Sequence, residues 1–257
     1  MEARAFETYT DQLRASLESA RDVLGFVTLG STADSTLRDQ WSDHDFWVIT
    51  KPGAQYKFVN DLSWLPDYDE IAIVVCHGKH GRAVLYRNRH QVEFAVFDVD
   101  QARTGKIERY QVLIDRGQIA ELIESVHQHT LEEARVKPDA LENLCATLWS
   151  ACERHCRGEL LSARQYIDGF AVNKLLNLIS GNEPDDERKD VLDPRRRLEL
   201  RSPALAAAVM SIRDLPVPDA ALRILELAEQ ELKQKSPNLA WEKVEMVRAW
   251  ILELVIK

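Results

Sequence analysis

The spacing of apolar residues changes near the middle of the chain. The first half combines helical spacing with short β-prone runs, whereas the second half has helical spacing almost throughout. Strands are predicted at residues 26–29, 45–50, 70–76, 82–87, 91–99 and 110–114, the run 70–76 as a buried strand. Helices are predicted at residues 3–24, 55–64, 118–128, 140–157, 159–179, 204–212, 219–235 and 239–256.

This order of elements predicts an α+β protein in two parts. Residues 1–116 are expected to form a mixed sheet of four or five strands flanked by helices, and residues 117–257 an all-α helical bundle. The one long polar interruption of the second part, residues 180–203, is predicted to be a loop between helices.

Composition narrows the class of protein. With 257 residues, 45% of them hydrophobic, the chain can bury a substantial core. The N-terminal segment has no apolar stretch like that of a signal peptide, and no run approaches the roughly 20 apolar residues that span a bilayer. We therefore expect a cytoplasmic protein with no membrane partner.

Charge bears on the partners of the protein. The formal net charge of −9 argues against general nucleic-acid binding, which depends on Lys and Arg neutralising phosphates. An acidic chain fits a cationic small substrate better, although solubility alone also accounts for its charge. The four cysteines lack paired metal-ligand spacing and are expected to be reduced thiols.

The candidate chemistry lies in the segment LGSTADSTLRDQWSDHDFWVIT. Asp43 and Asp45 stand two residues apart where a strand begins, so both carboxylates point to the same side and can bind a hard cation. Gly30 and Ser31 directly follow the preceding strand, where glycine permits close approach of a phosphate and the serine hydroxyl can bind it. The segment predicts a phosphate and magnesium site.

This Gly-Ser and Asp-x-Asp pattern resembles the signature of the DNA polymerase β-like nucleotidyltransferase superfamily. The wording WSDHDFWV is similar to that of the antibiotic nucleotidyltransferases, which adenylylate aminoglycosides or lincosamides. The resemblance covers about the first 115 residues, and a helical C-terminal domain also suits that group. It implies a nucleotidyltransferase catalytic domain in residues 1–116 and an acceptor side in residues 117–257.

The resemblance also implies cofactors and a third acid. Mg²⁺ would be held by Asp43 and Asp45, with ATP or another nucleoside triphosphate as co-substrate. In the family a third carboxylate comes from a later strand, and Glu93 is the best match, either as a metal ligand or as the base that accepts the substrate proton. Asp98 and Asp100 are rivals ranked below Glu93, because they fall at the end of that strand.

Two residues of the helical half are further candidates. Glu159 stands in an Arg-Gly-Glu stretch similar to one in related antibiotic nucleotidyltransferases, where a helical-domain acid serves as the base; a helix N-terminal acid without catalytic role is the alternative. Lys174 could bind the triphosphate, and an exposed helical lysine is its alternative. The basic run Arg195–Arg197 could contact phosphates or be solvated.

Three functions are compatible with this sequence. The leading one is transfer of a nucleoside monophosphate, AMP from ATP, to a hydroxyl of a small molecule, for which aminoglycosides and lincosamides are candidates and antibiotic resistance the implied role. The alternatives are a protein-modifying or antitoxin-type nucleotidyltransferase and a non-catalytic nucleotide-binding protein. The apolar C-terminal helix also leaves a homodimer open.

Overall fold

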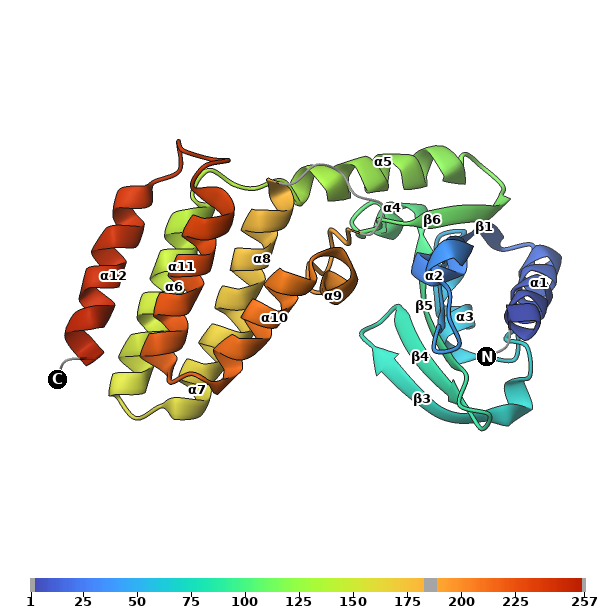
Figure 1. Cartoon of the computed structure of the whole chain (residues 1–257). Helices are drawn as coiled ribbons and strands as arrows, with labels where there is room; N and C mark the ends of the chain where they lie inside the picture. The colour runs from blue at the N-terminus through green and yellow to red at the C-terminus, as the bar shows by residue number, and fades with distance from the viewer. Residues whose placement is uncertain (1–2, 183–188, 256–257) are drawn as a thin grey trace. The chain divides into compact units, whose positions relative to one another are not determined.

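The computed structural model describes residues 3–182 and 189–255, which form two compact units, residues 1–133 and 134–257 (Figure 1). The first unit is α+β and the second is helical, as predicted from the sequence. The division falls one helix later than the expected 116/117, because the last helix of the first unit covers one face of its sheet. No helix among the described residues is long and apolar enough to cross a membrane.

Six strands form the sheet of the first unit, in the order β3-β4-β5-β2-β1-β6. Strands β2 and β5 run parallel and all other neighbours are antiparallel. The strands are β1 (Val23–Leu29), β2 (His44–Thr50), β3 (Ile71–His77), β4 (Gly81–Tyr86), β5 (Gln91–Asp98) and β6 (Tyr110–Asp115).

Each face of the sheet has its own core because side chains alternate along the strands. On one face Phe46 and Val48 pack against helix α1 (Ala3–Ser19) through residues such as Leu13. On the other face Trp47 and Ile49 pack against α4 (Val99–Ala102) and α5 (Ile119–Glu133). The remaining short elements are α2 (Gly30–Ala33), α3 (Gln55–Asn60) and the 3-10 turns η1 (Ser35–Leu37) and η2 (Tyr68–Glu70).

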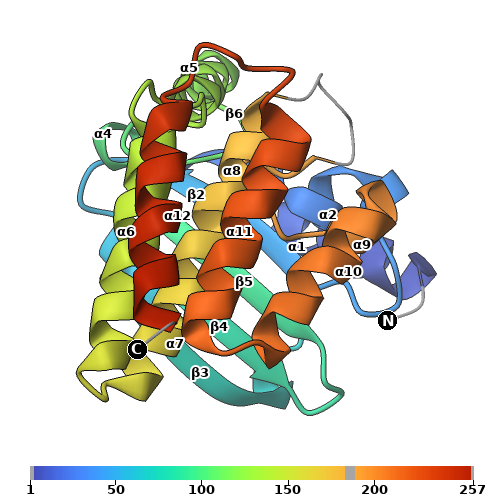
Figure 2. The same cartoon turned by 60° about the vertical axis from the view of Figure 1, so that its left-hand side comes forward.

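The second unit is built around parallel-lying long helices, seen side by side in Figure 2. Helix α6 (Ala140–Cys156) packs against α11 (Val217–Leu232) and α12 (Trp241–Val255), and their apolar faces share one core. The other elements are α7 (Leu160–Gln165), the π-helical turn η3 (Tyr166–Ala171), α8 (Val172–Gly181), α9 (Leu198–Arg201), α10 (Pro203–Ser211) and η4 (Ile212–Asp214).

Several details differ from the sequence-based expectations. The sheet has six strands rather than four or five. The strand expected to be buried at 70–76 is instead the exposed edge strand β3, since an apolar run of that length does not distinguish a central strand from an edge. The helix expected at 159–179 contains the π-helical turn, and α9 lies within the expected loop 180–203, of which residues 183–188 are outside the described residues.

Candidate active site

The predicted acids come from two neighbouring parallel strands. Asp43 immediately precedes β2, and Asp45 is its second residue. Asp45 lies on the same face as Trp47, whereas His44 points to the opposite face with Phe46. In the parallel register Glu93 on β5 stands opposite Asp45, so the sheet aligns these two acids on adjacent strands. All three acids are half-buried.

Thr32 joins the loop after β1 to both aspartates. Its hydroxyl oxygen accepts a hydrogen bond from the backbone nitrogen of Asp45 at 2.9 Å and lies 3.3 Å from the backbone oxygen of Asp43, to which it donates. Thr32 is only 5% exposed. One buried hydroxyl therefore fixes the backbone that carries the two acids to the segment that carries Gly30 and Ser31. The sequence interpretation did not single out Thr32, although its place directly after Gly-Ser was a signal.

Gly30 has the backbone conformation that glycine favours. Its φ is +51°, and a β-carbon built there would meet no atom within 4 Å, so the backbone borders open space. The Gly30 amide donates to the backbone oxygen of Arg109 at 3.0 Å. Arg38 approaches the backbone oxygen of Ser31 through Nε at 3.4 Å. The turn is thus held by the neighbouring β6 side and by Arg38, while one side of it stays accessible to a ligand.

The acids are not a preassembled three-ligand cage. Among the residues the structure describes, no group of three or more His, Cys, Asp or Glu side chains is placed to hold a metal ion. The Gln91 amide donates to Glu93 Oε1 at 2.6 Å. Mg²⁺ commonly binds one or two carboxylates and completes its shell with water and substrate phosphates. The pair Asp43 and Asp45 fits that pattern, with Glu93 beside it on the next strand.

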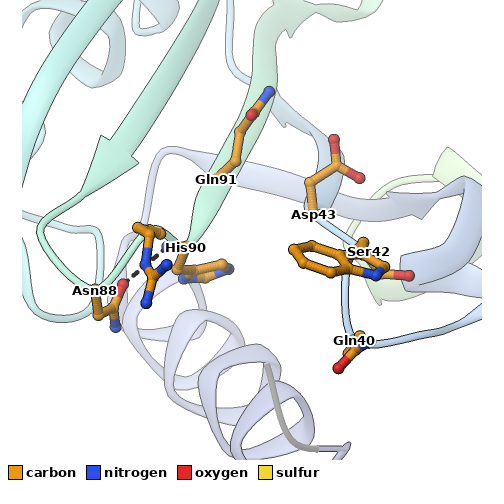
Figure 3. A pocket seen from close by; sticks show the side chains of 8 residues that line it. Gln40, Ser42, Asp43, Asn88, His90 and Gln91 are labelled. Atoms are coloured by element: carbon orange, nitrogen blue, oxygen red, sulfur yellow. Dashed lines mark hydrogen bonds between the residues drawn. The ribbon is translucent and has the colours of Figure 1, made fainter.

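A pocket of about 600 Å³ opens beside Asp43. Asp43 and Gln91 project to the same side of it from neighbouring segments (Figure 3). Trp41, which is 84% exposed, contributes a large aromatic surface to the lining. Carboxamides and one cation complete the wall, so the pocket offers hydrogen-bond donors and acceptors next to the acids; its further lining residues are Gln40, Ser42, Asn88, Arg89 and His90.

The residue between the two aspartates belongs to a buried imidazole pair. His44 Nδ1 lies 2.7 Å from His90 Nε2, and the His44 ring stacks on Phe6 with centroids 3.6 Å apart. His44 Nε2 also lies 3.0 Å from the Thr10 hydroxyl. Burial lowers the pKa of His44 to about 3, with His90 adding to the effect, and burial lowers the pKa of His90 to about 4. Both rings are neutral at pH 7 and anchor the Asp-x-Asp segment to α1.

The two rival acids have other roles in the structure. Asp98 caps α4, since its side chain accepts from the backbone nitrogen of Gln101 at 2.9 Å, and it also accepts from Gln55 Nε2 at 3.1 Å. Asp100 is a side chain 96% exposed that pairs with Arg103 at 4.0 Å. Neither stands in register with Asp45, which leaves Glu93 as the acid on β5 nearest to the predicted arrangement.

Glu159 and Lys174 lie in the second unit. Glu159 precedes α7 directly after Gly158, whose φ is +76°, so one helix does hand over to the next there. Its carboxylate pairs with Arg154 and Arg157, each at 3.1 Å. The Lys174 ammonium donates to Asn143 Oδ1. The structure therefore gives each side chain a partner within the helical unit, and their predicted roles stay predictions.

The basic run before α9 supports the π-helical turn. Arg195 Nη2 donates to the backbone oxygen of Gly169 at 2.6 Å and of Asp168 at 3.3 Å. A π-helical turn widens the helix and disturbs its regular backbone bonding, and Arg195 supplies donors to two of its carbonyl groups. Arg196 pairs with Asp190 at 3.4 Å. These contacts are structural ones within the helical unit.

Comparisons with known proteins complete the description. No family model matches the sequence, and no curated protein matches it significantly. A solved aminoglycoside 6-adenyltransferase from Bacillus subtilis matches 98% of this chain and 99% of its own length, with 10% identity and a TM-score of 0.39. A nucleotidyltransferase-like protein from Exiguobacterium sibiricum matches 90% of this chain and 77% of its own, with 11% identity and a TM-score of 0.35. Such low scores add no weight to a function.

Proposed function

We propose that this protein is a Mg²⁺-dependent nucleotidyltransferase that moves a nucleoside monophosphate, AMP from ATP, to a hydroxyl of a small molecule. The observation that carries the proposal is the joint of Thr32 with Asp43 and Asp45, which fixes two acids beside the Gly30 turn. The aligned Glu93 on β5 supports it. The signature resembling nucleotidyltransferases in residues 29–50 gives these groups their roles.

Each residue has a defined task in this proposal. Asp43 and Asp45 bind the metal, and the Gly30 and Ser31 segment binds phosphate oxygens through its backbone and the serine hydroxyl. Bound Mg²⁺ supplies charge neutralisation at the pyrophosphate leaving group. Thr32 holds the two parts together, so that the phosphates and the acids keep a fixed spacing.

The reaction forms one bond and breaks one. The acceptor oxygen bonds to the α-phosphorus while the bond from that phosphorus to the pyrophosphate oxygen breaks, and the hydroxyl proton passes to a carboxylate. Glu93 either completes the metal site or accepts this proton, and Glu159 is the second candidate for the base. Lys174 is proposed to bind the triphosphate, and residues 117–257 to provide the acceptor side.

The acceptor class follows from charge and resemblance. A chain with a formal charge of −9 attracts cationic molecules, and aminoglycosides carry several amino groups. Lincosamides are the second class that the resemblance implies. An antibiotic acceptor would make the protein a resistance enzyme, with its activity in the cytoplasm.

The test is Mg²⁺-dependent release of pyrophosphate from each of the four nucleoside triphosphates, with a panel of aminoglycosides and lincosamides as acceptors. We expect release with ATP that requires one acceptor class, and a mass increase of one AMP on that acceptor. The variant Asp43→Asn should be inactive, whereas Asp100→Asn, which changes an exposed acid beyond β5, should keep wild-type turnover.

The other outcomes separate the alternatives. Nucleotide incorporated into protein, with none on the drugs, would favour the protein-modifying function over the small-molecule one. ATP binding without turnover on either kind of acceptor would favour a non-catalytic nucleotide-binding protein. Absence of ATP binding in the presence of Mg²⁺ would refute the proposed site altogether.

A further inference from the structure

Strand β3 presents an apolar edge that no neighbouring strand covers. It is the last strand in the sheet order and pairs only with β4 among the described residues (Figure 1). Ile73 is 52% exposed, and Val74 and Val75 are each 46% exposed. The outer backbone groups of such a strand can form hydrogen bonds with another strand. Edge and side chains together make β3 an association surface.

The usual protections of an edge strand are missing from β3. Its seven residues, IAIVVCH, include no proline and no lysine, arginine or acid. The register irregularity opposite β4 lies near Ala72 and leaves Ile73 to His77 regularly paired. Proteins that stay monomeric commonly interrupt an exposed edge with a charge, a proline or a bulge in its middle. The middle of β3 has none of these.

The charges of this strand lie at its two ends and have opposite signs. Asp69 and Glu70 precede β3, and Lys79 follows it in the turn to β4. Asp69 and Lys79 are both exposed. An antiparallel partner with the same sequence would therefore bring an acidic end beside a basic end at each extremity of the strand.

We propose that β3 pairs antiparallel with β3 of a second copy of this chain, about a two-fold axis at Val74, so that the two sheets become continuous. Val74 is the central residue of Ile71–His77, so this register pairs the whole strand. It sets Ile71 opposite His77 and Ile73 opposite Val75 of the partner copy. The same register sets Asp69 opposite Lys79 at both ends.

The neighbouring registers are less favourable. A two-fold axis that keeps each residue opposite one on the same face must pass through a residue, so the register can shift only by moving the axis to Ile73 or Val75. With the axis at Ile73 Asp69 faces His77, and Lys79 has no residue of the acidic end opposite it. Only the axis at Val74 satisfies the complete strand and both pairs of charges.

The first experiment measures molar mass by light scattering on the full chain at protein concentrations from about 1 to 100 μM. We expect a dimer that Val74→Lys converts to a monomer, since the substitution sets two ammonium groups together at the axis. Asp69→Lys and Lys79→Asp should each weaken the dimer at least tenfold in dissociation constant. The double variant Asp69→Lys with Lys79→Asp should restore it, because the charges are exchanged on both copies.

The second experiment tests the register by cysteine cross-linking. Cys76→Ala with Cys156→Ala removes the two exposed thiols and serves as the background. Val74→Cys in this background should form an intermolecular disulfide on mild oxidation, because the axis sets the two cysteines opposite one another. Ala72→Cys is the matched control, since it lies on the same face but would stand opposite residue 76, and should not cross-link.

The two experiments can overturn the proposal in separate ways. A wild-type protein that is monomeric at every concentration refutes it, including the case in which another segment of the same chain covers β3. A dimer that Val74→Lys leaves intact refutes the surface, and cross-linking of Ala72→Cys rather than Val74→Cys refutes the register. Circular dichroism and melting temperature establish that each variant is folded. The inference is independent of the proposed enzymatic activity.

Discussion

The hydroxyl oxygen of Thr32 lies 2.9 Å from the backbone nitrogen of Asp45 and bridges it to the backbone oxygen of Asp43. Thr32→Val keeps the shape of the side chain but leaves the Asp45 amide without this acceptor. An unsatisfied buried donor costs about 1–3 kcal/mol, and we expect a loss of unfolding free energy in that range in urea titrations. Turnover should fall more than tenfold, with weaker Mg²⁺ dependence, because the acids are no longer fixed to the Gly30 turn.

Thr32→Ser is the matched control for that substitution, because it restores the hydroxyl without the methyl group. It should recover most of the Mg²⁺ dependence and turnover. Equal turnover in Thr32→Val and wild type would show that the joint has no role in positioning the acids, even where the stability loss is present.

Substitution of either aspartate should separate activity from stability. Asp43→Asn or Asp45→Asn is expected to lower turnover by about 100-fold or more, because a neutral amide binds Mg²⁺ poorly. The melting temperature should stay unchanged or rise, since removing one of two neighbouring acids relieves repulsion. Calorimetry and pyrophosphate release measure the two effects, and a large drop in melting temperature would identify these acids as structural.

The buried imidazole pair predicts a stability loss in mild acid. The unfolded chain binds protons at His44 and His90 below a pKa of about 6.5, whereas the folded protein binds them only near pH 3 and pH 4. Their contribution is therefore complete above pH 6.5 and is lost as the pH falls toward the folded values, by at most about 1.4 kcal/mol per pH unit and residue.

Urea unfolding at pH 7, 6 and 5 measures this dependence. His90→Gln removes one titrating group and should give a shallower decline than wild type between pH 6.5 and 5. An identical slope in the two proteins would mean that these imidazoles titrate normally in the folded state.

Glu159→Gln tests the second base candidate. A catalytic carboxylate would make this variant lose turnover much more than ATP affinity. Arg157→Gln is the matched control, since it breaks an ion pair of Glu159 while keeping the carboxylate. Both variants should change the unfolding free energy by less than about 1 kcal/mol, because these pairs are exposed. Unchanged kinetics in Glu159→Gln would assign Glu159 to the helix end alone.

Local sequence features predicted much of the fold and the two aspartates. The short β-prone runs around Gly30 and Asp45 became β1 and β2, and the long helical periods became the second unit. These features depend on neighbours in sequence, which a pattern records directly. The parallel register that aligns Glu93 with Asp45 was anticipated only through the family resemblance, because strand pairing joins residues far apart in the chain.

Features that depend on distant contacts escaped prediction. Thr32 reads as an ordinary polar residue until β2 folds against the turn that carries it. The π-helical turn is bonded by Arg195 from a separate segment, so helical periodicity does not reveal it. The exposure of β3 depends on its place at the end of the sheet order, which its apolar composition does not encode.

The alternation at Asp43, His44 and Asp45 constrains how this segment can change over evolutionary time. A one-residue insertion or deletion between His44 and Ile49 would exchange the two faces, drawing an acid into the core beside Phe6 and turning an imidazole outward. Length variation is far better tolerated in the exposed stretch around Asp39 and Gln40. Descendants of a common ancestor should therefore differ in loop length before Ser42 while keeping the spacing from Asp43 to Ile49 fixed.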